Sequence, residues 1–72
     1  MKIYVIAEVG VNDYWTGKKY THQGEEFLIF DVNPWKAKSW QSKKRAETAF
    51  NKLSAFQKQG LEVRKLAIQV TN

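Results

Sequence analysis

The sequence predicts an α+β fold, in which a three- or four-stranded, mainly antiparallel sheet carries one amphipathic helix on one face, in the order ββ(β)αβ. Two patterns predict this class. Apolar residues alternate at the start of the chain, as in a strand, and recur at helical spacing over residues 43–59. A length of 72 residues leaves room for one core, so we expect a single domain over residues 1–72.

Residues 2–9 are predicted to form the first strand. Ile3, Val5 and Ala7 share one face by the two-residue period, while Tyr4 and Ile6 lie on the other. Because both faces are partly apolar, we expect this strand inside the sheet.

The next part of the chain has one clear strand and one ambiguous segment. Residues 10–25 are too long for a simple hairpin loop, so they either contain strand extensions or form a functional loop. Residues 26–32 hold a continuous apolar run and are predicted to form a strand that Pro34 ends. A short third strand is expected over residues 37–41.

The helix is predicted over residues 43–59, with Ser42 as its N-cap and Gly60 as its C-cap. Residues 61–70 then form the last strand, although their apolar positions change face. A bulge near Arg64 and Lys65, or burial on both sides at different points, would explain the change. The apolar face of the helix contains Ala46, Ala49, Phe50, Leu53 and Phe56.

The composition limits the classes of function. The chain has no cysteine, which excludes disulfides and thiolate metal sites and suits a reducing compartment. It shows no signal-peptide pattern and no stretch long enough to span a membrane, so we expect a cytoplasmic protein. The net charge of +5 favours nucleic acid, an acidic protein surface or anionic lipid as a partner without choosing between them, and we expect nucleic acid or an acidic protein surface and no membrane.

Catalysis is not expected. His22 is the only histidine, and a triad would have to recruit it together with Asp13 or Asp31, without any nucleophile-elbow motif. Glu25 and Glu26 would point to opposite faces of a strand, which makes a poor carboxylate pair. The glycines fit no nucleotide-binding pattern, and metal ligands are mostly absent. We therefore predict a binding protein with no cofactor and no metal.

Residues 33–45 combine cations with tryptophans and contain no acidic residue. This combination suits nucleic acid, because cations contact phosphates and aromatic rings stack on bases. The alternative is that the tryptophans anchor the core and the cations are only solvated. The candidate residues for binding nucleic acid or another anion are Trp35, Lys36, Lys38, Trp40, Ser42, Lys43, Lys44 and Arg45.

Three of these cations, Lys43, Lys44 and Arg45, fall in the first turn of the predicted helix. Cations are unfavourable there, because the N-terminus is the positive end of the helix dipole. An anion docked beside Ser42 and the free N–H groups would explain the cluster. The alternative is that the three cations are only solvated and that salt screens their unfavourable interaction with the dipole.

A second candidate surface lies in the segment 14–20. Exposed aromatic residues beside lysines are typical of protein-binding hot spots. The alternative is that these aromatic rings pack on the sheet. The candidate protein-binding residues are Tyr14, Trp15, Lys18, Lys19 and Tyr20.

The helix entry, Ala37-x-x-Trp40-x-Ser42 followed by Ala46 and Ala49 and a final strand, resembles small proteins encoded by phages and prophages. The resemblance implies an accessory protein that binds and redirects a host factor, and it assigns no functional residues. Three hypotheses therefore stand: a nucleic-acid-binding module, a binder of a host protein, and a structural component of a larger assembly. A homodimer formed through a sheet edge is a further option.

Overall fold

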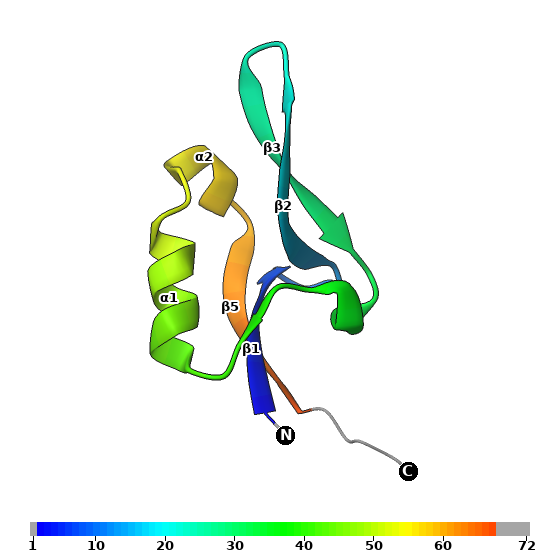
Figure 1. The fold of residues 1–72 in the computed structure, drawn as a ribbon, viewed down its shortest axis with the longest axis vertical. Helices are drawn as coiled ribbons and strands as arrows, with labels where there is room; N and C mark the ends of the chain where they lie inside the picture. Colours follow the sequence, from blue (N-terminus) through cyan, green and yellow to red (C-terminus); the bar gives the residue numbers. More distant parts are fainter. Residues whose placement is uncertain (1, 68–72) are drawn as a thin grey trace.

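The strand β1 lies at the centre of the sheet, with the other strands arranged around it (Figure 1). This computed structural model describes residues 2–67. A mainly antiparallel sheet with one longer helix packed on it confirms the predicted α+β class. In chain order the elements are β1 (Lys2–Glu8), β2 (Tyr14–His22), β3 (Glu25–Asp31), the 3-10 turn η1 (Pro34–Lys36), β4 (Ser39–Trp40), α1 (Lys43–Asn51), α2 (Ala55–Lys58) and β5 (Leu61–Ala67).

The prediction that the first strand is interior is confirmed. β5 pairs with β1 along its whole length, while β4 and β2 share the other edge of β1. Burial on both faces follows from this position, and the fully buried residues are Val5, Ile6 and Ala7.

Of the two options for residues 10–25, the structure shows a strand, which gives the sheet five strands. β2 pairs with β3 in a long hairpin that projects beyond the rest of the molecule (Figure 1). Trp15 lies opposite Phe30, but Lys19 lies opposite Leu28, so β2 has two extra residues between these pairs. Gly17 lies within this bulge at a φ of +85°, a conformation that glycine adopts without a Cβ clash.

The predicted bulge near Arg64 and Lys65 is wrong. β5 pairs with β1 residue for residue, and the change of face has the other predicted cause, burial on both sides. Leu61 and Val63 pack under the helices, whereas Leu66 packs on the opposite face. Residues 68–70 of the predicted strand lie outside the described residues.

The single helix predicted over residues 43–59 is also wrong, because the chain forms two helices. Ser54 interrupts the helix by forming a capping box: its hydroxyl accepts from the N–H of Gln57, and the Gln57 side chain accepts from the N–H of Ser54, both at 3.1 Å. These local bonds start α2 in a new direction. As a result Leu53 is buried, whereas Phe56 is 64% exposed.

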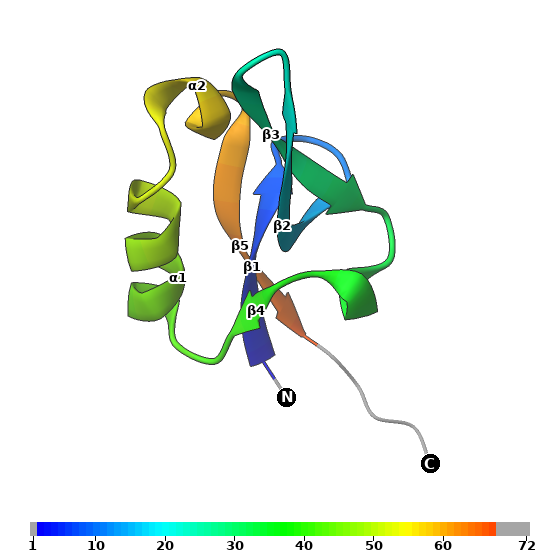
Figure 2. The same ribbon diagram turned by 45° about the horizontal axis from the view of Figure 1, so that its top comes forward.

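The predicted third strand is shortened to Ser39–Trp40, and an unpredicted 3-10 turn precedes it (Figure 2). Asn33 caps this turn, since its side-chain oxygen accepts from the N–H of Trp35 at 2.9 Å. Pro34 stands at the first position of the turn, where a missing N–H costs nothing.

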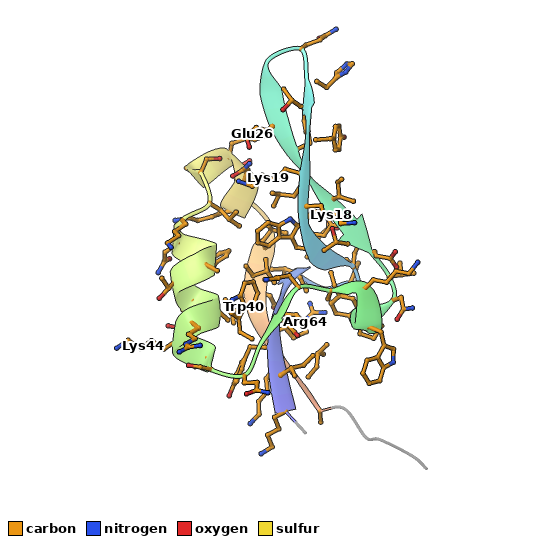
Figure 3. All side chains as sticks on the ribbon, in the orientation of Figure 1. Lys18, Lys19, Glu26, Trp40, Lys44 and Arg64 are labelled. Atoms are coloured by element: carbon orange, nitrogen blue, oxygen red, sulfur yellow. The ribbon has the colours of Figure 1, made fainter. Side chains whose placement is uncertain are left out.

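The core consists of two apolar clusters, one on each face of β1. One contains Ile6, Trp15 and Leu53 on the side of the helices. The other lies on the opposite side, where Arg64 holds the loop after β1 in place by donating to the carbonyls of Glu8 and Val11, each at 2.9 Å (Figure 3). The buried residues of this second cluster are Ile3, Val5, Ala7 and Tyr14.

Candidate functional site

The structure divides the predicted basic and aromatic segment into two separate groups. The first is at η1, where the Trp35 side chain is 67% exposed. Lys36 is beside it and pairs with Asp31 at 3.8 Å, which offsets its charge. Lys38 is exposed beside the bulge of β2, and its N–H donates to the carbonyl of Trp15. This group therefore has an exposed ring but little excess positive charge.

The second group begins at Trp40, which is half-buried and packs against the core cluster under the helices. Its register explains this position, because Trp40 lies opposite Tyr4 on the central strand. Trp40 therefore has the predicted alternative role of a core anchor at the helix entry, rather than that of a ring free to stack on a base. Trp35 remains the exposed tryptophan of the two.

The helix begins at Lys43, as predicted, with Ser42 as its cap. The Ser42 hydroxyl accepts from the N–H of Arg45 at 3.4 Å. Lys43 pairs with Glu47 on the next turn at 3.9 Å, and both side chains are exposed. Lys44 and Arg45 are exposed too, and neither has a carboxylate of residues 2–67 within 4 Å. Figure 3 shows Lys44 directed away from the sheet.

The fold adds two cations that sequence reasoning missed. Lys65 on β5 lies opposite Tyr4, which lies opposite Trp40 on its other side, so the three form one row across the sheet. With strands about 4.8 Å apart, this row spans roughly 10 Å. Lys2 is two residues before Tyr4 and shares its face. We call the five exposed cations at this end of the molecule, Lys2, Lys43, Lys44, Arg45 and Lys65, the basic end.

Arg45 of the basic end lines an open hollow between β4 and the start of α1. The hollow is lined by residues that carry hydroxyl, amide and guanidinium groups and by the half-buried Trp40. Glu47 is the acidic residue of α1, and no acidic residue lines the hollow. The residues that line it are Ser39, Trp40, Gln41, Ser42 and Arg45.

The predicted protein-binding segment is not assembled as one surface. Tyr14 and Trp15 are buried at 6% and 8% exposure, so the alternative that these rings pack on the sheet is correct for both. The Trp15 indole N–H donates to the carbonyl of Lys18 at 2.9 Å, which holds the bulge of β2 together. Tyr20 is the exposed aromatic residue of the segment and stacks on Phe27 across the hairpin, with centroids 5.3 Å apart.

The described residues contain no group of side chains arranged for a metal site. His22 is exposed near the hairpin tip, and residues 2–67 contain no group of three or more His, Asp or Glu side chains able to hold a metal ion. Within the same residues, no helix has the length and apolar character needed to cross a membrane.

Comparison with protein-family models, with curated proteins and with solved structures finds no match to this chain. The resemblance to phage-encoded proteins therefore stays a prediction.

Proposed function

We propose that this protein is a non-enzymatic module that binds nucleic acid through its basic end. The observation that carries the proposal is the gathering of five exposed cations from β1, α1 and β5, and among residues 2–67 only Lys43 of the five has a carboxylate partner. Pairing of β1 with β5 brings Lys2 and Lys65 onto one face, and α1 with its three cations packs against both strands.

Phosphates are the chemical group that this surface suits. Neutralising them releases counterions, and this term dominates sequence-independent affinity for nucleic acid. The lining hydroxyls of Ser39 and Ser42 and the amide of Gln41 are groups that commonly bind phosphate and sugar oxygens. Because Trp40 is half-buried, contacts with the backbone carry the binding, and we expect little preference for sequence.

The test is fluorescence anisotropy with a labelled single-stranded DNA and its RNA counterpart. For single strands, the log of the affinity falls against the log of the salt concentration by about 0.7 per phosphate contact. Each lost contact therefore costs roughly fivefold in affinity at 0.1 M salt, relative to 1 M. Replacing Lys43, Lys44 and Arg45 by glutamine should therefore weaken binding about a hundredfold.

The matched control removes three positive charges elsewhere, by replacing Lys18, Lys36 and Lys38 with glutamine. Net charge falls equally in both variants, so a difference between them locates the site. Equal losses in the two variants, or binding to polyglutamate in place of nucleic acid, would contradict the proposal.

A further inference from the structure

Residues of the β2–β3 hairpin and of α2 line a groove together with Glu8 and Leu61. The hairpin and α2 lie at the opposite end of β1 from the start of α1 (Figure 1). The volume of the groove is about 260 Å³, and a second hollow of about 400 Å³ shares Glu26, Phe56 and Gln57 with it. Both hollows are open to solvent, so a segment of a larger partner can lie along them. The apolar side chains that line the groove, which we call the hairpin groove, are Tyr20, Phe27, Leu28, Phe30, Phe56 and Leu61.

Two large side chains of the groove are presented to solvent. Phe56 is 64% exposed and Tyr20 is 51% exposed. The capping box of Ser54 fixes α2 in the orientation that turns Phe56 away from the core. An aromatic ring held in solvent by a capped helix is a preorganised contact, because little further ordering is needed when a partner covers it.

The rim of the groove is acidic, although the chain as a whole is basic. Glu8 and Glu26 line the groove, and Glu25 lines a hollow that continues from it past Phe56. Lys19 pairs with Glu26 at 3.7 Å on the side of the hairpin that faces α2 (Figure 3). Three carboxylates against one lysine leave the rim negative, and no lysine or arginine lines either hollow.

The negative charge of the rim favours a positively charged partner for the groove. Carboxylates repel phosphates, so the hairpin groove and the basic end suit different partners. The two surfaces are separated by the length of β1 from Lys2 to Glu8, roughly 20 Å at the rise of a strand.

A second copy of this chain is a poorer occupant. β3 is one of the edge strands of the sheet, and antiparallel pairing of two copies about Leu28 would place Glu25 opposite Asp31. Like charges directly opposite one another destabilise a strand pair. A foreign segment with positive charges does not meet this repulsion.

We propose that the hairpin groove is a docking site for a segment of another protein whose apolar side chains are flanked by lysine or arginine. The apolar side chains cover Phe56 and Tyr20, and the cations face Glu8, Glu25 and Glu26. The proposal is independent of nucleic-acid binding, because it uses none of the residues of the basic end.

Three labelled peptides test the proposal by fluorescence anisotropy. The first has a core of leucine and phenylalanine flanked by two lysines at each end. The second replaces these lysines by glutamates, and the third replaces the apolar core by serines. We expect the first peptide to bind at least tenfold more tightly than either of the others.

Variants of the protein locate the contact. Phe56→Ala should weaken binding of the first peptide at least tenfold, as expected when a central aromatic contact is truncated. Glu8→Gln combined with Glu26→Gln should reduce both affinity and salt dependence. Val32→Ala is the matched control, because Val32 is 74% exposed and lies outside the groove, and it should change nothing.

The result that overturns the proposal is equal binding of the lysine and glutamate peptides, or unchanged affinity in Phe56→Ala. Sedimentation at increasing concentration gives a second way to overturn it. Self-association that Phe56→Ala abolishes would assign the groove to a second copy. Loss of nucleic-acid binding in the basic-end variant with peptide binding retained would show that the two surfaces act separately.

Discussion

Leu53 and Phe56 differ by three positions, and the break between α1 and α2 gives them opposite environments. In one continuous helix both side chains would lie on the same apolar face. In the structure Leu53 is 6% exposed and packs in the cluster with Ile6 and Trp15, whereas Phe56 is 64% exposed. Alanine at each position therefore measures whether the helix is broken at Ser54.

The expected losses of stability differ widely. Leu53→Ala removes a buried side chain, and such substitutions cost roughly 2–5 kcal/mol. A domain of this size is stable by only about 3–5 kcal/mol, so this variant should lose most of its stability. Phe56→Ala removes a mainly exposed side chain and should stay within about 0.5 kcal/mol of the wild type.

Urea titration followed by tryptophan fluorescence, with circular dichroism as a second probe, gives both free energies of unfolding. In thermal melts, a loss of about 3 kcal/mol corresponds to a fall in Tm of roughly 12–24 °C for a domain of this size. A loss in Phe56→Ala as large as that in Leu53→Ala would refute the broken helix. It would also remove the preorganised ring on which the hairpin groove depends.

Two further substitutions test the hairpin and the loop after β1. Both Gly10 and Gly17 have positive φ, so alanine at either position should cost about 1–2 kcal/mol of stability from the backbone alone. Gly17→Ala should cost more than Gly10→Ala, because a Cβ at Gly17 would lie 3.1 Å from the Cβ of Lys38, whereas one at Gly10 meets nothing within 4 Å. Equal Tm values for the two variants would contradict the close approach of Gly17 and Lys38. Arg64→Met should lose roughly 1.5–3 kcal/mol of stability, and Arg64→Lys should not restore it, because a single ammonium lacks the fork that donates to two loop carbonyls. Hydrogen exchange of the Val11 amide should accelerate in both variants. Slow exchange in either variant would contradict the role of Arg64 in holding the loop.

Much of the fold could be predicted because its patterns are local. Two apolar faces on residues 2–9 indicated an interior strand, and β1 is the central strand of the sheet. The break in the helix had a local signal as well, since Ser54 and Gln57 have the spacing of a capping box. The apolar periodicity that runs through both helices outweighed that signal. Asn33 followed by Pro34 similarly indicates the start of a helical turn as well as the end of a strand, and the structure shows both.

The candidate site could be predicted only in part, because its remainder depends on pairing between distant strands. The cations of the first helical turn are adjacent in the sequence, and the helix does begin at Lys43. Lys2 and Lys65 join them only because β1 pairs with β5, which no local pattern specifies. Trp35 and Trp40 have similar neighbours in the sequence, and only the pairing of Trp40 with Tyr4 decides which ring is covered.

The salt dependence of binding to single-stranded DNA tests the role of the basic end most directly. Five phosphate contacts give a slope of log affinity against log salt of about −3.5, and the two contacts left after Lys43, Lys44 and Arg45 become glutamine give about −1.4. We expect anisotropy titrations between low and physiological salt to reproduce both slopes. A wild-type slope near zero, or an unchanged slope in the variant, would contradict the account.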